Sequence, residues 1–319
     1  MILFTGGKTA GHIYPLIALI KEINEKSIFI GYSDSLEEKI CRKEKVSFIG
    51  LKPSKNKYIT GIKGYKKLKK ELKDMQIDCV ISTGGYVSLS GLLYSFFNNI
   101  PLYLIEENVI MGRANKLFSK YAKKIFLTYE LKEMSQKYII TGLPIRKIEY
   151  KPMDIKYDVL IIGGSLGSRP LCDIAESLSR HYKVCLIAGK YYDNYIKYDN
   201  LDILEYVDNI FDYMKASKVI ISRAGASTTY EIMSLGIPLI VCPSDNTKDN
   251  HQYLNALYLL GKNACKLVRE EDLRNNLIDV IATLINNDNI RINMISNQKK
   301  LADSGASKRI AKIIKEDIK

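Results

Sequence analysis

The sequence lacks the features that mark secreted, metal-binding and membrane-spanning proteins. Its six cysteines include no C-x-x-C pair, and several lie within apolar runs. We therefore expect reduced, mostly buried thiols in a cytosolic protein, and no zinc site. No apolar run approaches about 18 residues, and the opening MILF resembles a strand rather than a signal peptide. We expect neither secretion nor a membrane span.

The chain has 319 residues, 46% of them hydrophobic, which is enough for two domains with cores of their own. The net charge is +13, and between Lys52 and Asp74 nine lysines accompany only two acidic residues. Such a block faces an anionic membrane surface, nucleic acid, or simply solvent. It contains no arginine and few aromatic residues, so we do not expect nucleic acid as a partner.

Short apolar segments alternate with helical segments along the whole chain, the pattern of a doubly wound α/β protein with parallel sheets. Two series are predicted, 1–146 and 158–303, joined by a polar linker at 147–157. The predicted strands are 2–5, 28–31, 79–82, 102–105, 124–128 and 138–141, then 158–162, 184–188, 201–206, 219–222, 239–241 and 264–267. Helices are expected between them and from about 272 to 317.

Each series opens with a strand that runs into glycines, at 6–12 and at 163–168. Glycine after a strand permits positive φ and close approach of the backbone to a ligand. Neither loop has G-x-G-x-x-G spacing, and Gly7-Lys8-Thr9 lacks the earlier glycine of an ATPase P-loop. Ligands of such sheets bind at the carboxyl ends of strands, so the two loops predict a cleft between two domains and a two-substrate transfer enzyme.

The segment 218–243 reads as a strand, a turn at Arg223-Ala224-Gly225-Ala226 and a helix over 227–235 that ends at Gly236. The free N–H groups of the helix's first turn would cradle a phosphate. Glu231 has two interpretations. It is a carboxylate for the vicinal hydroxyls of a sugar, or it completes a T-x-x-E capping box with Thr228.

His12 lies at the end of the first glycine loop, before a helix whose first position Pro15 can occupy. A helix N-terminus favours the neutral imidazole that a general base needs. His12 is therefore a candidate to accept a proton from an attacking sugar hydroxyl. The alternative is that it only caps the helix or bonds a loop carbonyl. Asn108, at a strand end, and Arg146, at the linker, are weaker candidates when taken alone.

Seven stretches taken in order resemble the MurG family of N-acetylglucosaminyltransferases. They are GGKTAGHIYP (6–15), STGGYVS (82–88), EENVIMGRANK (106–116), TGLPIR (141–146), GGSLGS (163–168), SRAGASTTYEIMSLGIP (222–238) and KDNHQYLNA (248–256). The resemblance implies a GT-B fold, with two facing Rossmann-like domains and a last helix, about 304–319, that returns to the N-terminal domain. Lys8 and Ala10 stand where the family has glycines, and Lys8 would either help to hold the acceptor's pyrophosphate or face solvent.

The resemblance also implies a set of site residues. His12 would be the base. Glu231 would bind the ribose, Val207 the uracil through its backbone, Ser165 and Thr228 the diphosphate, and Gln252 and Asn255 the N-acetylglucosamine. Arg146, Asn108 and Thr9 would complete the pocket from the other side, and Gly11, Gly225 and His251 lie in the same matching stretches.

The implied reaction is an inverting transfer of N-acetylglucosamine from UDP-N-acetylglucosamine to the muramyl 4-hydroxyl of lipid I, giving lipid II at the cytoplasmic face of the membrane. No D-x-D triplet is present, so no metal and no cofactor is expected. The lysine block together with the apolar segment 92–97 would dock on anionic lipid. Two other functions stay open: a GT-B enzyme acting on another lipid acceptor such as diacylglycerol, and a non-catalytic nucleotide-sugar or nucleic-acid binding protein.

Overall fold

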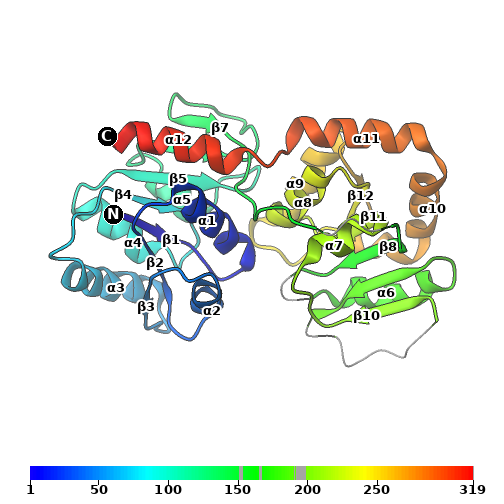
Figure 1. The fold of residues 1–319 in the computed structure, drawn as a ribbon, viewed down its shortest axis with the longest axis horizontal. Helices are drawn as coiled ribbons and strands as arrows, with labels where there is room; N and C mark the ends of the chain where they lie inside the picture. The colour runs from blue at the N-terminus through cyan, green and yellow to red at the C-terminus, as the bar shows by residue number, and fades with distance from the viewer. Residues whose placement is uncertain (151–153, 165–166, 190, 192–198, 319) are drawn as a thin grey trace. The chain divides into compact units, whose positions relative to one another are not determined.

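The computed structural model describes residues 1–318 apart from 151–153, 165–166, 190 and 192–198. The chain divides into two compact units, Met1–Lys147 with Ser304–Lys319, and Ile148–Asp303. Each unit is built on one sheet (Figure 1).

The first unit has a seven-stranded sheet with the order β3-β2-β1-β4-β5-β6-β7, and neighbouring strands are parallel throughout. Its strands are β1 (Ile2–Thr5), β2 (Ser27–Tyr32), β3 (Phe48–Leu51), β4 (Cys79–Ser82), β5 (Leu102–Glu106), β6 (Lys124–Leu127) and β7 (Tyr138–Ile140). The central strands β1, β4 and β5 are buried along their whole length, as apolar strands covered on both faces should be.

The helices of this unit are α1 (Ala10–Ile23), α2 (Leu36–Lys43), α3 (Lys57–Glu71), α4 (Leu89–Phe97), α5 (Arg113–Phe118) and α12 (Ala306–Ile318). Residues of α3, α4 and α5 pack in one core with Leu3, Val80 and Leu104 of the sheet. Helix α1 packs against α2 and α12. The C-terminal α12 is held by Arg309, which donates to the carbonyl of Thr141, and by an ion pair of Asp317 with Lys124 at 2.8 Å.

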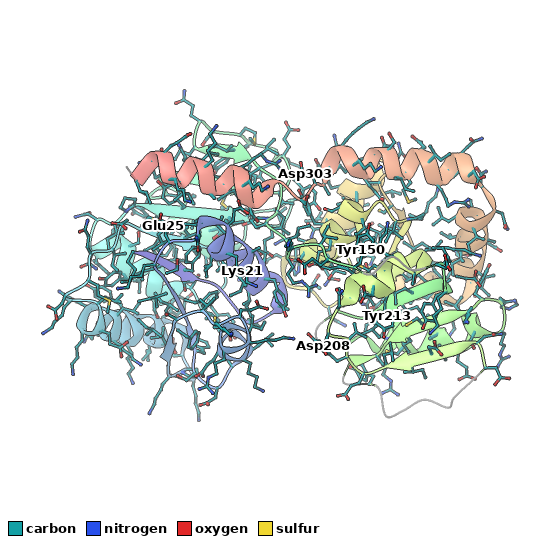
Figure 2. All side chains as sticks on the ribbon, viewed as in Figure 1. Lys21, Glu25, Tyr150, Asp208, Tyr213 and Asp303 are labelled. Carbon is teal, nitrogen blue, oxygen red and sulfur yellow. The ribbon has the colours of Figure 1, made fainter. Side chains whose placement is uncertain are left out.

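The second unit has a six-stranded parallel sheet with the order β10-β9-β8-β11-β12-β13. Its elements are β8 (Tyr157–Ile162), α6 (Arg169–Ser179), β9 (Val184–Ile187), β10 (Leu201–Leu204), α7 (Ile210–Lys215), β11 (Ser217–Ser222), α8 (Ala226–Leu235), β12 (Leu239–Val241), η2 (Lys248–Asn250), α9 (His251–Gly261), β13 (Lys266–Leu267), η3 (Glu270–Asp272), α10 (Leu273–Asn286) and α11 (Asp288–Leu301). Alternate residues of β8 and β11, such as Val159 and Val219, pack with α6 and α10. After α11 the backbone N–H of Asp303, a residue that Figure 2 labels, donates to the hydroxyl of the buried Tyr230.

The two parallel-sheet units confirm the predicted fold class, and every predicted strand is present, although several are shorter. Strand β3 was not predicted, because it is a short, half-buried edge strand that contains Gly50 and therefore has a weak apolar pattern. The predicted place of Pro15 was wrong. Helix α1 begins at Ala10, and Pro15 lies inside it. All six cysteines are buried free thiols, as expected.

The strand orders put the ligand-binding edge of each sheet at the glycine loops. In both sheets the order reverses beside the first strand, between β1 and β4 and between β8 and β11. Crevices in doubly wound sheets form at the carboxyl ends of the strands that flank such a reversal. The candidate positions are therefore the loops after β1 and β4 in the first unit, and the loops after β8 and β11 in the second.

Candidate functional site

The loop after β1 is held by contacts from two neighbouring segments. The backbone N–H of Lys8 donates to the Glu37 carboxylate at 2.5 Å, and the Thr83 hydroxyl donates to the carbonyl of His12 at 2.8 Å. Lys8 has φ +82°, in the left-handed region that non-glycine residues rarely adopt. These contacts fix the start of α1, and with it the backbone of His12.

His12 lies in the first turn of α1, and its Nδ1 atom is 3.2 Å from Oε1 of Glu107, just beyond β5. The His12 side chain is 28% exposed and the Glu107 side chain 5%. Neither of these two atoms has a hydrogen-bond partner among the described residues, so their approach is an ion-pair contact. The pair therefore fixes the orientation of the imidazole ring, and solvent or a substrate still has access to it.

The charge state of His12 differs from the sequence expectation. Burial opposes the charged imidazolium, but the carboxylates of Glu107 and, more weakly, Glu106 outweigh it and raise the pKa of His12 to about 8. The expected preference for neutral imidazole, argued from the helix N-terminus, was therefore wrong, because a carboxylate at 3.2 Å acts more strongly than the helix dipole. Glu107 was not singled out in the sequence, where only its position after a buried strand marks it.

Glu106, the residue before Glu107, organises the loop that follows β5. Its buried carboxylate accepts from the backbone N–H groups of Asn108 (3.1 Å) and Gly112 (2.9 Å) and from the side-chain amide of Asn115 (2.9 Å). Burial raises the pKa of Glu106 in spite of these hydrogen bonds. The network holds the residues on either side of Glu107, so the carboxylate beside His12 stands on a rigid support.

The other predicted residues of the first unit lie in the same loops or next to them. Thr9 is the N-cap of α1, without a side-chain capping bond, and Gly11 precedes His12 in the first turn. The Asn108 amide lies 3.4 Å from Oε1 of Glu106. The Arg146 guanidinium stacks on the ring of Tyr14 in α1, with its Cζ 4.5 Å from the ring centroid. Arg146 is thereby held beside the helix that carries His12.

In the second unit, the loop after β8 approaches the start of α6 closely. A Cβ at Gly163 would lie 2.6 Å from the backbone nitrogen of Ser168, so only glycine fits there. Ser168 is the N-cap of α6, but its hydroxyl makes no capping bond, is buried, and has no hydrogen-bond partner among the described residues. Ser165, the predicted diphosphate ligand, lies outside the described residues. Ser168 was missed as a candidate, although it belongs to the same glycine-rich stretch.

The turn after β11 excludes the capping-box interpretation of Glu231. Helix α8 begins at Ala226 with Gly225 as its N-cap, so Thr228 is already inside the first turn and cannot cap the helix. Glu231 lies in the middle of α8 and is 6% exposed. The start of α8 carries no side-chain cap, and the N-terminus of a helix attracts anions through its positive dipole end.

Several side chains hold this turn in place. Arg223 donates to the carbonyl of Cys242 at 3.0 Å and forms an ion pair with Glu270. Asn255, 1% exposed, donates from its amide to the carbonyl of Ala224 at 3.2 Å, and Gln252 accepts from the backbone N–H of Ser244 at 3.0 Å. These bonds give Asn255 and Gln252 a structural task beside the sugar contacts predicted for them.

The remaining predicted residues lie at the ends of elements. Val207 is in the connection between β10 and α7, and His251 is the first residue of α9. Among the described residues no group of three or more His, Cys, Asp or Glu side chains is placed to hold a metal ion. The predicted residues thus form two groups, one at the loops of each sheet.

Comparisons with known proteins give the class first. The C-terminal domain model of glycosyltransferase family 28 matches residues 158–312, and its N-terminal domain model matches residues 2–127. Among solved structures, MurG of Acinetobacter baumannii has a TM-score of 0.79 at 19% identity, with 99% of each chain covered. The kitacinnamycin glycosyltransferase has a TM-score of 0.80 at 11% identity, covering 100% of this chain and 99% of that one. The fold is that of the GT-B glycosyltransferases.

Curated relatives identify the family within this class of glycosyltransferases. A UDP-N-acetylglucosamine–N-acetylmuramyl-(pentapeptide) pyrophosphoryl-undecaprenol N-acetylglucosamine transferase of Sulfurihydrogenibium is 34% identical over 308 residues, 87% of each chain. The enzyme of the same name from Bacillus subtilis is 32% identical, with 99% of each chain covered. This chain belongs to the MurG family of glycosyltransferase family 28, as its motifs indicated.

Proposed function

We propose that this chain transfers N-acetylglucosamine from UDP-N-acetylglucosamine to the 4-hydroxyl of the muramyl unit of pyrophosphoryl-undecaprenol-linked muramyl pentapeptide. The proposal combines the family with one geometric observation, the 3.2 Å approach of His12 Nδ1 to the Glu107 carboxylate at the edge of the first sheet. An imidazole that a carboxylate holds through Nδ1 keeps Nε2 for proton transfer.

The proposed chemistry is a single displacement with inversion. The muramyl 4-hydroxyl gives its proton to Nε2 of His12, its oxygen forms a bond to the anomeric carbon, and the bond from that carbon to the diphosphate oxygen breaks to release UDP. Glu107 stabilises the imidazolium that results. With a pKa of about 8, roughly a tenth of His12 is neutral at pH 7, but that fraction is a stronger base than ordinary imidazole.

On the donor side, we assign the diphosphate to the glycine loop after β8 and to the start of α8. The uncapped N-terminus of α8, including Gly225 and Thr228, offers backbone N–H groups to the charge that develops on the leaving UDP. Arg146 is assigned to the same charge. Glu231 is assigned to the ribose hydroxyls, Val207 to uracil, and His251, Gln252 and Asn255 to the sugar.

The test offers the purified chain several donors and acceptors. UDP-N-acetylglucosamine, UDP-glucose and UDP-galactose are each incubated with the muramyl-pentapeptide lipid and with diacylglycerol, and the products are identified by mass. We expect one added N-acetylglucosamine on the muramyl lipid only. Transfer to diacylglycerol alone would identify another lipid glycosyltransferase, and no transfer with steep salt-dependent binding to DNA would favour a binding protein.

An exposed aromatic patch on the first unit bears on where this reaction takes place. We define it as Tyr65, Phe97, Phe96 and Tyr121, whose rings follow one another in this order at centroid distances of 5.2, 5.2 and 4.6 Å. Phe97 is 58% exposed and Tyr121 57%. Leu92 and Tyr94 are buried, so only part of the segment 92–97 reaches the surface. Most of the lysine block lies on the adjoining α3, for example Lys66 and Lys70, both exposed.

We infer that the aromatic patch and the lysines of α3 attach this unit to an anionic membrane at its cytoplasmic face, where the lipid-linked acceptor lies. Aromatic rings suit the interface of a bilayer, and basic side chains are drawn to its anionic head groups. In the part of the chain that the structure covers, no helix has the length and apolar character of a membrane span. The alternative is a solvated helix face.

Co-sedimentation with vesicles of phosphatidylglycerol and phosphatidylcholine tests the attachment. The double variant Lys66→Glu/Lys70→Glu should release the protein from the vesicles, and Phe97→Ser should weaken binding. The matched controls are Lys39→Glu/Lys45→Glu, also exposed lysines of this unit, and Ile292→Ser, an exposed apolar residue of the second unit. Binding that is insensitive to salt and equal in all variants would support the solvated face.

A further inference from the structure

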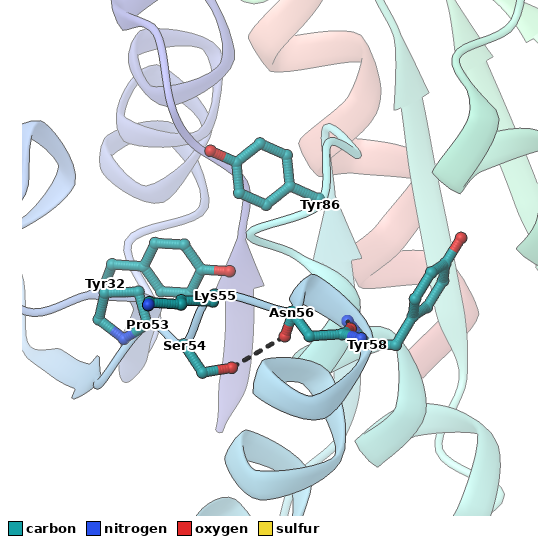
Figure 3. Close-up of a pocket in the computed structure, with 7 residues that line it drawn as sticks. All are labelled: Tyr32, Pro53, Ser54, Lys55, Asn56, Tyr58 and Tyr86. Carbon is teal, nitrogen blue, oxygen red and sulfur yellow. Dashed lines mark hydrogen bonds between the residues drawn. The ribbon is translucent and has the colours of Figure 1, made fainter.

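A hollow of about 610 Å³ lies at the carboxyl edge of the first sheet and has no place in the reaction described above. It is lined by Tyr32, Pro53, Ser54, Lys55, Asn56, Tyr58 and Tyr86, from the ends of β2, β3 and β4 and the start of α3. Figure 3 shows Tyr86 on one side and Tyr32 with Pro53 on the other. The Ser54 hydroxyl donates to the carbonyl of Asn56, which holds the turn into α3.

The lining combines aromatic faces with positive charge. The rings of Tyr32 and Tyr86 lie 6.2 Å apart, and Nζ of Lys8 is 5.6 Å from the centroid of Tyr86. Burial, with smaller contributions from Tyr86 and Glu37, raises the pKa of Tyr32 to about 12, so its phenol stays neutral. In the described part of the chain, no carboxylate lies within 4 Å of the ammonium group of Lys8 or Lys55. Of these two lysines, Lys55 lines the hollow and Lys8 contacts Tyr86 of its lining, and neither ammonium has a carboxylate partner among the described residues.

The hollow is connected to the proposed base through the glycine loop. Lys8 lies in the loop that leads into α1, four residues before His12 in the first turn of that helix. Tyr86 follows Gly85, where an added Cβ would be 3.6 Å from the carbonyl of Gly7. Thr83, at the start of the Tyr86 loop, donates to the carbonyl of His12. An acceptor whose hydroxyl reaches His12 would therefore bring its substituents to this hollow.

The size and chemistry of the hollow suit the peptide of such an acceptor better than its diphosphate. Its volume lies in the range of about 300–1,000 Å³ that holds an organic ligand of moderate size, more than a diphosphate needs. Tyrosine rings and a proline suit peptide planes and aliphatic side chains. Lysine ammonium groups suit carboxylates. A diphosphate is better served by backbone N–H groups of glycine loops.

We propose that this hollow binds the peptide of the acceptor, with the tyrosine faces against the peptide and with Lys8 and Lys55 paired to its carboxylates. The proposal rests on the proposed function and names the part of the substrate that the first unit selects. It also accounts for Lys8, a lysine held at φ +82° where glycine would fit without strain. The side chain at this position contributes the cation that stacks on Tyr86.

The experiment measures selectivity between acceptors. Initial rates are determined with pyrophosphoryl-muramyl acceptors that carry the whole pentapeptide, only its first residue, or the pentapeptide with its carboxylates amidated. The variants are Lys8→Gly and Lys55→Gln. The matched control is Lys45→Gly, which also removes an exposed lysine from a left-handed position, φ +56°, in the connection from α2 to β3.

We expect the ratio of kcat/KM for the pentapeptide acceptor to that for the one-residue acceptor to fall roughly 10-fold in Lys8→Gly and in Lys55→Gln. The ratio should not change in Lys45→Gly. Amidation should lower the wild-type ratio by a similar factor, with little further loss in the two variants, because both changes remove the same ion pairs.

Two results would overturn the proposal while the proposed function stands. One is a wild-type enzyme that uses both acceptors with a ratio that no variant alters. The other is an equal loss on both acceptors in Lys8→Gly and Lys55→Gln, which would assign the two cations to the diphosphate instead. Absence of transfer by the wild-type chain to every muramyl acceptor would overturn the proposed function, and this proposal with it.

Discussion

His12 and Glu107 are joined across the edge of the first sheet, with Nδ1 of His12 3.2 Å from Oε1 of Glu107. One residue comes from the first turn of α1 and the other follows β5, and both positions are fixed independently. Thr83 bonds the carbonyl of His12, and Glu106 holds the loop on the far side of Glu107. A base that must meet one hydroxyl benefits from such rigid support.

Replacing His12 by alanine should lower kcat by about 100-fold or more and leave the affinity for UDP-N-acetylglucosamine unchanged. The reason is that His12 is assigned to proton transfer and belongs to the unit that does not carry the donor loops. Steady-state turnover and calorimetric titration with the donor measure the two quantities. His181→Ala, an exposed histidine of the second unit, serves as the control. Undiminished turnover in His12→Ala would remove the residue from this role.

The pH dependence should report the effect of Glu107. Because the base must be neutral, kcat/KM of the wild type should rise with pH and level off above about 8, the pKa of His12. In Glu107→Gln the burial of His12 remains but the largest raising effect is gone, so the rise should move to lower pH. The plateau should also be lower, because the ring loses its oriented partner.

Glu22→Gln, an exposed change on α1, is the control for the pH profile and should match the wild type. A Glu107→Gln profile that coincides with the wild type would show that the carboxylate does not set the pKa of the base.

Glu231→Gln should raise the dissociation constant for UDP roughly 10-fold with little change in the melting temperature. A carboxylate binds two vicinal hydroxyls better than an amide of the same shape, while α8 does not rely on Glu231 as a cap. Glu271→Gln, at an exposed position of the same unit, controls for the loss of charge. Loss of stability without loss of UDP affinity would return Glu231 to a structural role.

Local sequence patterns predicted the fold well, because its central strands are buried on both faces. Strands such as β1 and β11 are short apolar runs bounded by glycine or polar residues. The edge strand β3 was not predicted because it is half-buried and holds Gly50, so its residues show neither alternation nor a continuous apolar run. The first residues of the helices were predicted less accurately. Thr228 and Glu231 have the spacing of a capping box, but the turn at Gly225 begins the helix earlier.

The pairing of site residues could not be read from the sequence. Nothing near His12 in the chain indicates Glu107, since only the parallel arrangement of β1, β4 and β5 brings their carboxyl ends together. The pKa of His12 follows from that tertiary contact and so reversed the expectation drawn from its helix position alone. The structural bond of Asn255 was not foreseen for the same reason, because its hydrogen bond to Ala224 joins α9 to the turn after β11.

The Ser168 hydroxyl leads to a prediction that its removal affects UDP binding but not the stability of the protein. At most helix starts a serine side chain stabilises the helix, but the Ser168 hydroxyl is buried without a capping bond or another described partner. Ser168→Ala should therefore leave the free energy of unfolding of the ligand-free protein almost unchanged.

The same variant should weaken UDP binding roughly 10-fold, because a hydroxyl at the start of α6 can donate to a diphosphate oxygen. Asn287→Ala is the matched control. Asn287 caps α11 by accepting from the backbone N–H of Ile290, so its loss should cost about 1 kcal/mol of stability and leave UDP affinity intact. Chemical denaturation and UDP titration of both variants make the comparison. If Ser168→Ala behaved like Asn287→Ala, the hydroxyl would be a helix cap and not a ligand of the diphosphate.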